Sequence, residues 1–348
     1  MVTLAEVARR ANVTAATVSN VLRNPQKVKT STVERVMAVI RELDYRPNLT
    51  ARALAEGRTP TLALMLSNIT NPFYPEFVLA AEREARKRGY YLLVTNTDDD
   101  PAITRSYLER IAGTLAAGAI VMNTDLAEFE LADLSRHGAA IVLCMWEHVP
   151  ASHTLPCVTV DFAAAGALAA AHLSGLRHRR FGALVGKGSG GPQSVRLRGF
   201  VDALVSRGHA ERAVTTVSTH DSIEGGYDAT MALLRAHPDL TALFATNDLM
   251  AIGALQAAAD LGRRVPDDLS VVGMTDIQLA HQFRPALTTV RFPTPLIAAH
   301  AIAMALEMIE GEPPSESTRV CGTPELVVRE STAVAPTRRK ATSARRSN

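Results

Sequence analysis

Residues 3–22 read TLAEVARRANVTAATVSNVL, and this stretch determines what the N-terminal part of the chain can be. Thr3 stands three residues before Glu6, which is the spacing of a capping box at the start of a helix. Asn12 follows that helix, and asparagine adopts a left-handed backbone at low cost. Thr14 can then cap a second helix that continues to the end of the stretch. The pattern predicts two short helices joined by a tight turn.

A third helix is expected from Thr30 or Ser31 to Leu43, because apolar residues recur there at helical spacing. Three such helices form a helix-turn-helix unit, which we assign to residues 1–46. The segment 47–59 could form about two helical turns, and isolated helices below about 12–15 residues are barely stable in water. We therefore interpret this segment as a hinge helix or linker that needs a partner to order it.

Charge is distributed unevenly along the chain. Residues 1–58 carry ten Lys and Arg against five Asp and Glu, whereas residues 59–330 carry twenty-two against thirty. The last segment, 331–348, holds five basic residues and no acidic one, and we interpret it as a basic disordered tail. A basic head on an acidic body suits a polyanionic partner at one end only.

The second helix of the head presents small polar side chains opposite its apolar face. Asparagine can bond adenine with two hydrogen bonds, and threonine and alanine methyl groups can pack on thymine methyls. Lys27, with Lys29 and Arg46, would hold phosphates and fix register without reading sequence. The DNA-binding candidates in the head are Thr14, Ala15, Ala16, Thr17, Asn20 and Lys27. The alternative is a trihelical protein-interaction module, and the basic charge favours DNA.

From Thr61 onward, short apolar runs alternate with longer helical patterns. The predicted strands are 62–66, 91–95, 119–122, 140–144, 181–185, 213–217, 242–245 and 269–272. Such alternation implies parallel sheets covered by helices on both faces. We expect an α/β body of two parallel-sheet subdomains with a ligand cleft between them. Their predicted bounds are about 60–160 plus 291–320 and about 161–290 plus 321–330.

A glycine-rich loop offers a second interpretation. Gly186–Gly191 reads GKGSGG, which contains the GxGxxG pattern of dinucleotide-binding folds. Asp221 would be the ribose-binding acid, but it lies 30 residues after Gly191, later than the usual ~20. An NAD-binding oxidoreductase is therefore the alternative, and we expect a protein that is not an enzyme. The residue spacing suggests no metal site, P-loop or catalytic triad.

The distribution of apolar residues and cysteines indicates the cellular compartment in which we expect the protein. Hydrophobic residues make up 47% of the chain, yet no apolar run reaches the ~18–20 residues of a membrane span. The N-terminus lacks the layout of a signal peptide, so we expect a cytoplasmic protein that does not bind a membrane. Cys144, Cys157 and Cys321 have no metal-ligand spacing and are interpreted as reduced core thiols.

Motifs along the whole chain resemble the LacI/GalR (lactose/galactose repressor) family of regulators. They comprise Thr3–Ala8, Ala11–Ser19, Leu43–Asn48, Asn71–Tyr74, Arg196 with Gly199-Phe200, Thr246–Leu255, Val265–Gly273 and Phe283–Val290. The resemblance spans residues 3–330, with the motifs in order. It implies a body like that of periplasmic (type I) sugar-binding proteins.

The resemblance also implies a function. Family members are homodimers that bind palindromic operators, usually as repressors, and a small-molecule effector such as a sugar controls them allosterically. Their linker becomes a hinge helix on double-stranded operator DNA, where a leucine wedges into the minor groove. Leu54, preceded by Arg52, stands in that place, and such a wedge trades unstacking energy for a bent duplex.

Effector contacts carry over from the family less completely. Aromatic rings after the first body strand could stack on a sugar face, and Arg196 matches the arginine that contacts effectors. Thr275 stands where many relatives place an acid that anchors the ligand, and Asp221 stands where they often place an aromatic residue. Both changes argue against copying the effector of any one relative. The effector-binding candidates are Phe73, Tyr74, Trp146, Arg196, Asp221, Asn247, Thr275 and Asp276.

Overall fold

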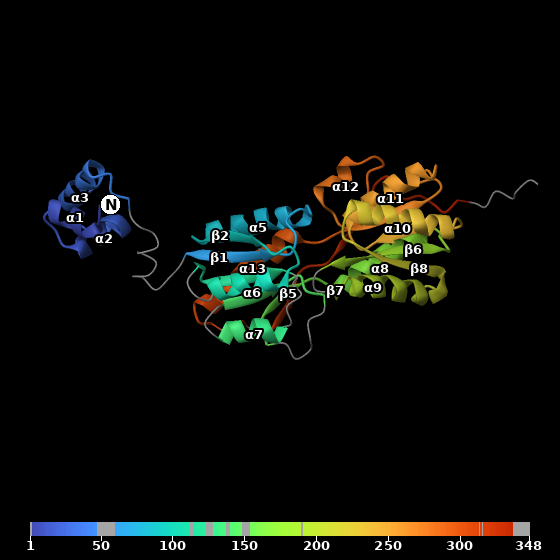
Figure 1. Cartoon of the computed structure of the whole chain (residues 1–348), viewed down its shortest axis with the longest axis horizontal. Coiled ribbons are helices and arrows are strands. Elements are labelled where there is room, and N and C mark those ends of the chain that lie inside the picture. The colour runs from blue at the N-terminus through green and yellow to red at the C-terminus, as the bar shows by residue number, and fades with distance from the viewer. Residues whose placement is uncertain are drawn as a thin grey trace, which may run out of the picture. The chain divides into compact units, whose positions relative to one another are not determined.

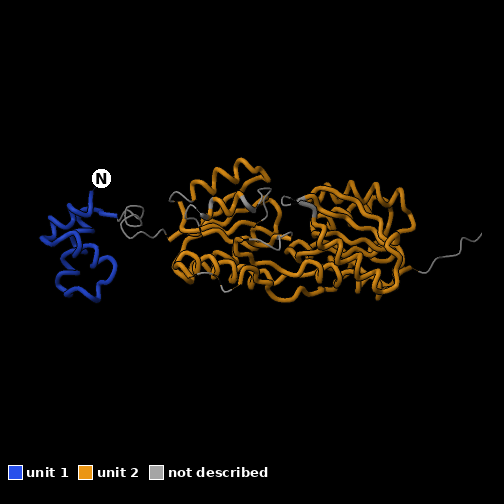
Figure 2. Tube along the Cα trace, turned by 90° about the horizontal axis from the view of Figure 1, so that it is seen from below, with its two compact units in different colours: residues 1–59 blue, residues 60–348 orange. Residues whose placement is uncertain are grey.

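The computed structural model describes residues 2–46, 60–111, 115–122, 128–136, 140–147, 154–188, 191–312, 314 and 316–336 of the 348-residue chain. The chain divides into two compact units, residues 1–59 and 60–348 (Figure 2). The predicted hinge at 47–59, with Arg52 and Leu54, lies outside the described residues. The same holds for 337–348.

The first unit contains the three expected helices, α1 (Leu4–Arg10), α2 (Ala15–Arg23) and α3 (Thr30–Glu42). A short 3₁₀ turn at Pro25–Lys27, which the sequence pattern did not predict, joins α2 to α3. The turn between α1 and α2 has Asn12 at φ 50°, and this confirms the left-handed backbone predicted there.

Side-chain caps start the first two helices. The Thr3 hydroxyl accepts a hydrogen bond from the Glu6 amide at 3.3 Å, and the Thr14 hydroxyl accepts one from the Thr17 amide at 3.1 Å. Each cap satisfies an amide that the first helical turn leaves without an intrahelical partner. The helices then pack on one small core: Val7, Ala8, Ala11, Val18, Val21, Val36, Val39 and Tyr45.

The second unit contains two sheets, and its first sheet is parallel throughout. Its strand order is β12-β5-β4-β3-β1-β2. The bounds are β1 (Thr61–Leu66), β2 (Tyr91–Asn96), β3 (Gly118–Met122), β4 (Ala140–Cys144), β5 (Cys157–Thr159) and β12 (Thr318–Val320). The sequence pattern did not predict β5 or β12, because each is only three residues long.

Helices cover both faces of this sheet, as two-sided apolar strands require. On one face lie α5 (Phe73–Lys87) and α13 (Thr294–Ile309), and on the other lie α6 (Pro101–Arg110) and α7 (Glu128–Arg136) (Figure 1). Alternate residues of β1 divide between the two cores: Leu62 and Leu64 join one, and Ala63 and Met65 the other.

The second sheet has the order β13-β11-β10-β9-β6-β7, with β8 paired to β6. The bounds are β6 (Phe181–Gly188), β7 (Gly191–Pro192), β8 (Val214–Thr219), β9 (Ala242–Ala245), β10 (Ser270–Thr275), β11 (Thr288–Arg291) and β13 (Glu325–Val327). The strands at both ends of that order run antiparallel to their neighbours, which departs from the expected all-parallel sheet.

Two pairs of helices cover this second sheet. The pair α8 (Phe162–Gly175) and α9 (Ser194–Ser206) packs on one face, and α10 (Ile223–Ala236) with α11 (Asp248–Asp260) packs on the other (Figure 1). A short helix, α12 (Gln278–Gln282), follows β10. No helix within the described ranges is long and apolar enough to cross a membrane.

The predicted disordered tail is wrong for its first residues. Ser331 is fully buried, and its hydroxyl donates to the Val271 carbonyl at 2.6 Å. The Ala335 amide donates to the Leu176 carbonyl at 2.8 Å. Residues 331–336 therefore belong to the body, because their backbone and small polar side chains bond to the second sheet and to the end of α8.

Candidate functional site

The predicted DNA-contacting face of α2 lies at the surface of the head. Its opposite face is fixed in the core by Val18 and Val21, which are 0% and 3% exposed. Thr17 is half-buried, because its hydroxyl bonds the Thr14 hydroxyl at 2.9 Å beside the cap. The remaining candidates in the head are exposed: Thr14, Ala15, Ala16, Asn20 and Lys27.

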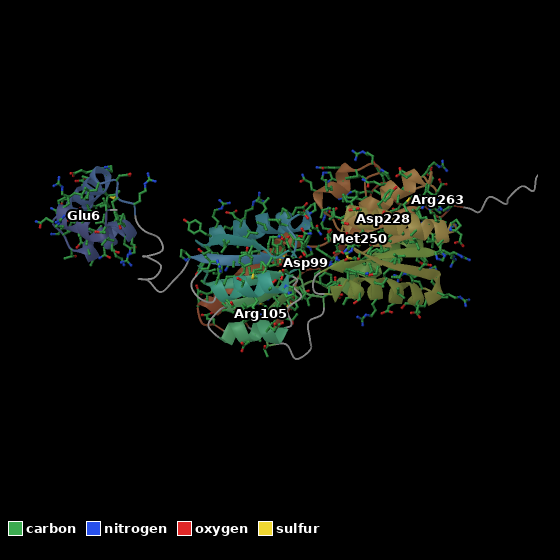
Figure 3. The ribbon with its side chains drawn as sticks, in the orientation of Figure 1. Glu6, Asp99, Arg105, Asp228, Met250 and Arg263 are labelled. Carbon is green, nitrogen blue, oxygen red and sulfur yellow. The ribbon has the colours of Figure 1, made fainter. Side chains whose placement is uncertain are left out.

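In the body, a second group of residues gathers where strands of the two sheets end. We call it the polar cluster: Glu147, Gln193, Arg196, Asp221, Thr246 and Asn247. Its members lie just beyond β4, β8 and β9 or at the start of α9. Carboxyl ends of parallel strands are where open α/β sheets place their ligands. Asp99 follows β2 and therefore lies, like Glu147, beyond the carboxyl ends of the strands of the first sheet (Figure 3). Its charge acts on Asp221.

Arg196 connects the two sheets. Its Nε donates to Glu147 Oε1 at 2.5 Å, and its Nη1 donates to the Thr246 carbonyl at 2.8 Å. The guanidinium also lies over the rings of Phe162 and Phe292, at 4.8 and 5.6 Å from their centroids. Its side chain is 7% exposed and that of Glu147 is 9%, so water screens this ion pair little. The arginine is held rigidly on two sides.

A chain of hydrogen bonds orients Asp221. The Gly186 amide donates to the Thr246 hydroxyl at 3.0 Å, and that hydroxyl donates to Gln193 Oε1 at 2.5 Å. The Gln193 amide nitrogen then donates to Asp221 Oδ2 at 2.5 Å. A Cβ on Gly186 would lie 1.7 Å from Asp221 Oδ1, so only glycine leaves room for this carboxylate.

Three polar atoms of the cluster are buried with no hydrogen-bond partner among the described residues. They are Glu147 Oε2, Asp221 Oδ1 and Asn247 Nδ2. Buried polar atoms are nearly always bonded in folded proteins, so each such atom requires an explanation. The Asn247 Oδ1 atom caps α11 by accepting from the Met250 amide at 2.9 Å, which fixes its Nδ2 toward the cluster.

Burial raises the pKa of Asp221 to about 6, against its ordinary 3.8. The charge of Arg196 and the nearby Asn247 amide lower this pKa, whereas Glu147 and Asp99 raise it. Near neutral pH the carboxyl is therefore mostly ionised. The cluster can accept hydrogen bonds at two carboxylate oxygens and donate one from Asn247, which suits a small ligand rich in polar groups.

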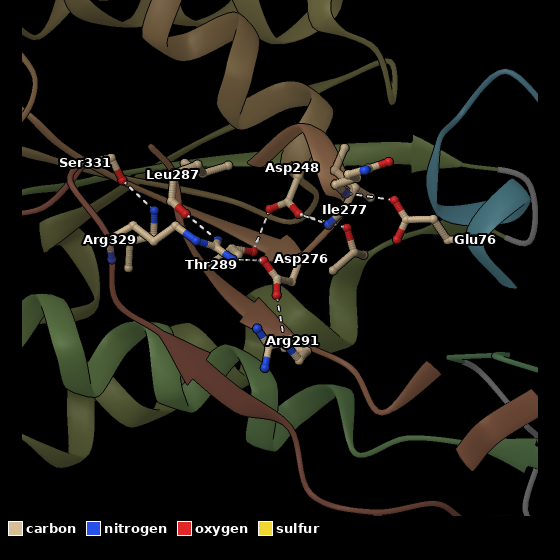
Figure 4. Close-up of polar contacts among 12 residues, drawn as sticks. Glu76, Asp248, Asp276, Ile277, Leu287, Thr289, Arg291, Arg329 and Ser331 are labelled. Atoms are coloured by element: carbon tan, nitrogen blue, oxygen red, sulfur yellow. Dashed lines mark hydrogen bonds and ion pairs between the residues drawn. The ribbon is translucent and has the colours of Figure 1, made fainter. Parts of the chain in front are cut away.

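Asp276 lies in a neighbouring network around Asp248 (Figure 4), and the Thr275 hydroxyl joins that network by donating to Asp248. Asp248 is 1% exposed, and its carboxylate accepts from Thr289 at 2.6 Å, from the Ile277 amide at 2.9 Å and from Thr275 at 3.2 Å. Burial raises its pKa to about 6, although the hydrogen bonds from Thr289 and Ile277 lower it.

Asp276 in this network forms ion pairs with Arg329 at 2.6 Å and with Arg291 at 2.7 Å. Both of its carboxylate oxygens are thereby engaged. The structure thus shows internal partners for Thr275 and Asp276, which were expected to contact the effector, and neither bonds the polar cluster in the described contacts.

The aromatic candidates lie in the two cores. Phe73 and Tyr74 are 9% and 7% exposed, and the Tyr74 hydroxyl bonds the Ser67 hydroxyl at 2.7 Å. The Trp146 indole donates to the Val121 carbonyl at 3.1 Å and packs half-buried against the core beneath β1. Packing covers the rings of Phe73 and Tyr74 in this structure, and their stacking on a ligand stays a prediction.

The glycine-rich loop differs from a dinucleotide site. Strand β6 extends to Gly188 and pairs with β7 in an antiparallel hairpin, Lys187 opposite Pro192. Helix α9 begins only at Ser194, and its N-cap residue, Gln193, makes no capping hydrogen bond through its side chain. A dinucleotide loop leads directly from a strand into a helix N-terminus, and this hairpin does not.

Sequence reasoning missed three members of the cluster: Glu147, Gln193 and Thr246. Thr246 directly follows β9, Gln193 directly precedes α9, and Glu147 lies three residues after β4, and these positions were the available signal. Glu147 was the hardest to find, because it lies 49 residues from Arg196 and meets it only across the two sheets.

Comparisons with known proteins match both units. "Bacterial regulatory proteins, lacI family" matches residues 3–48, and "Periplasmic binding protein-like domain" matches residues 170–332. The transcriptional regulator GalR of Escherichia coli (strain K12) is 33% identical over 333 residues, which cover 95% of this chain and 96% of GalR.

Solved structures of two transcriptional regulators have a similar fold. The lac repressor dimer bound to operator and the anti-inducer ONPF has a TM-score of 0.84 at 23% identity, covering 95% of this chain and 99% of that one. The complex of the transcriptional regulator CelR with cellobiose has a TM-score of 0.70 at 28% identity, covering 95% and 100%.

A helix-turn-helix head and a two-sheet body of the periplasmic-binding type define a DNA-binding transcriptional regulator. Within that class, the chain belongs to the LacI family of bacterial regulatory proteins. The resemblance and the fold class inferred from the motifs are thereby confirmed.

Proposed function

We propose that this chain is a repressor that binds a palindromic operator as a homodimer in the cytoplasm, and that a sugar or related metabolite in the polar cluster changes its affinity for DNA. The role is regulation rather than catalysis. The carrying observation is that one unit exposes a capped recognition helix while the other holds buried polar atoms without partners. The solved lac repressor is a dimer bound to its operator, which supports the assembly, and the CelR–cellobiose complex supports the ligand class.

Selection from random double-stranded DNA tests the first half. The full-length protein should enrich an inverted repeat, because a two-fold dimer reads two half-sites. Analytical ultracentrifugation should give a dimer alone and one dimer per selected site. A protein that enriches no sequence, or that binds selected DNA as a monomer, contradicts this part of the proposal.

Asn20→Ala tests whether α2 reads bases. The side chain is exposed near the middle of α2, where it can reach an adenine edge. We expect affinity for the selected operator to fall by about 30-fold or more, because the dimer loses two bidentate base contacts of ~1–3 kcal/mol each. Affinity for random DNA is the internal control and should stay nearly constant. An equal loss on both DNAs would instead assign Asn20 to the phosphate backbone.

A thermal-shift screen of sugars, polyols and nucleosides tests the second half. A ligand that binds only the folded state raises Tm by mass action. Each ligand found is then added to the operator-binding assay, where it should change affinity by about 5- to 150-fold. Linkage requires operator DNA to change ligand affinity by the same factor. Ligand binding that leaves operator affinity unchanged refutes the allosteric proposal.

A further inference from the structure

Charge distinguishes the polar cluster from a neutral sugar site. Two buried carboxylates, Glu147 and Asp221, act on each other, and the charge of Asp99 reaches Asp221 as well. Against them stands the Arg196 guanidinium, which already donates to Glu147 and to the Thr246 carbonyl. Among these described residues, three carboxylates stand against one guanidinium, so the surroundings of the cluster carry excess negative charge.

Acceptors predominate among the buried cluster atoms that have no partner in the described residues. Two of them, Glu147 Oε2 and Asp221 Oδ1, accept hydrogen bonds, and one, Asn247 Nδ2, donates. Asn247 is 4% exposed and the Glu147 side chain is 9% exposed, so water does not readily satisfy these atoms. The hydrogen-bond chain from Gly186 commits the Gln193 amide to the other oxygen of Asp221.

Each class of ligand meets these atoms differently. A carboxylate or phosphate would face two acceptors of its own sign, which costs free energy in a buried site. A hydroxyl could serve one acceptor, but it leaves the excess negative charge unbalanced. An ammonium group carries three donors and a positive charge, and can therefore serve both carboxylate oxygens at once. The Asn247 side-chain amide, which already lowers the pKa of Asp221, can also donate to a ligand hydroxyl.

We propose that the ligand of the polar cluster is an amino-bearing polyhydroxyl compound of the amino-sugar class, whose ammonium group lies between Glu147 and Asp221. This inference rests on the proposed effector site and specifies the charge of its ligand. Asp221 sets the preference, because its carboxylate is oriented by Gln193 and packed against Gly186. Glu147 shares its charge with Arg196 and contributes less.

The test is isothermal titration of the full-length protein, at pH 7.5 and low salt, with matched sugars that differ in charge. The probes are the amino, neutral and uronic acid forms of glucose, galactose and mannose. In at least one series, the amino sugar should bind about tenfold or more tighter than the neutral sugar, with the uronate weakest. If no amino sugar binds, or if a neutral or acidic sugar binds as tightly as its amino form, the proposal is overturned.

Replacing Asp221 by asparagine tests whether the preference depends on the charge of this side chain or on its shape. Asp221→Asn keeps an acceptor for Gln193 and removes the charge, so the amino-to-neutral preference should fall to about threefold or less. Asp228→Asn, an equal charge change on the exposed face of α10 (Figure 3), should retain the full preference. A preference that survives in Asp221→Asn contradicts the assignment.

Operator affinity, measured in parallel, distinguishes the two proposals. A neutral sugar that binds best and shifts operator affinity would overturn the charge inference while sustaining the proposed function. An amino sugar that binds with the stated preference but leaves operator affinity unchanged would sustain the charge inference and refute the regulatory role.

Discussion

Lys27 should contribute to DNA binding without contributing to sequence choice. It is exposed at the end of the 3₁₀ turn beside α2, where an ammonium can meet a phosphate. We expect Lys27→Ala to weaken binding to operator and random DNA by a similar factor. Because each bound dimer loses two such contacts and releases about two counterions fewer, the slope of log affinity against log salt should decrease in magnitude by about 1.8.

Arg41→Ala provides the charge-matched control for Lys27. Arg41 is exposed in the last turn of α3, and its loss changes the net charge of the head by the same amount. Fluorescence anisotropy over a range of salt concentrations measures both slopes. Equal slopes for Lys27→Ala and the unaltered protein would show that Lys27 contacts no phosphate.

The pKa of Asp248 predicts a pH dependence of stability. Burial raises this pKa from 3.8 to about 6, so the folded chain binds the proton more tightly than the unfolded chain does. Its contribution to stability is therefore largest below pH ~4 and is lost as pH rises through ~6. The shift corresponds to on the order of 3 kcal/mol.

Asp248→Asn removes this titrating group. The free energy of unfolding of the unaltered protein minus that of Asp248→Asn should decrease between pH 4.5 and 7, measured by urea denaturation. Asp228→Asn, where the carboxylate is exposed, should show no such trend. A constant difference across this range would mean that the Asp248 carboxyl titrates at its ordinary pKa.

For individual residues, the sequence predicted where along the strands they lie better than which side chains they contact. Asp221 and Asn247 were predicted at the site and do lie in the polar cluster, because their places after β8 and β9 follow from strand order. Phe73 and Tyr74 were expected to face a ligand, but whether a ring near a strand end is covered depends on tertiary packing. No local pattern encodes that packing.

Among the elements, the α8–α9 pair depends on a close helix contact. A Cβ on Gly199 of α9 would lie 2.1 Å from the Ala163 carbonyl oxygen of α8, and one on Gly166 of α8 would lie 2.1 Å from the Arg196 carbonyl oxygen. The contact also brings the Phe162 ring of α8 against the Arg196 guanidinium. A methyl group at either glycine must separate the helices.

Gly199→Ala should therefore lower the free energy of unfolding by about 1–3 kcal/mol, the usual cost of overpacking. Gly175→Ala is the matched control, because Gly175 ends α8 with no other atom within 4 Å of its added Cβ. That change should leave stability unchanged or raise it by up to ~1 kcal/mol, since alanine favours helix. Thermal denaturation measures both. Equal Tm values for the two variants would show that α8 and α9 adjust without strain.

Periodicity located most elements to within a residue or two, and failed where context decides. Strands β4 and β9 have the predicted bounds, because their apolar runs are sharply ended. The GxGxxG pattern suggested a turn into a helix, but its strand continues into a hairpin. A short glycine-rich segment permits both conformations, and pairing with β7 decides between them.

In the second unit as a whole, the expected two-sheet division holds because strand alternation and the right-handed crossover leave few topologies. What the sequence could not show is how the sheets touch. Besides the ion pair between Glu147 and Arg196, one hydrogen bond joins α5 to α12. The backbone amide of Gln278 donates to Glu76 Oε1 at 2.7 Å (Figure 4). Desolvation raises the pKa of Glu76, while this bond lowers it.

The bond between Glu76 and Gln278 should stabilise the arrangement in which the polar cluster is assembled. When only a fraction of the protein is in the binding-competent arrangement, its apparent ligand affinity is reduced in proportion to that fraction. Glu76→Ala removes a charged acceptor that contributes ~1.5–3 kcal/mol, so ligand affinity should fall by up to about tenfold although Glu76 lies outside the cluster. Glu76→Gln keeps a carbonyl acceptor for the Gln278 amide and should recover most of the affinity. Hydrogen exchange should show the Gln278 amide less protected in the alanine variant alone. Unchanged ligand affinity with lost protection would mean that this bond orders α12 locally and does not hold the two sheets together.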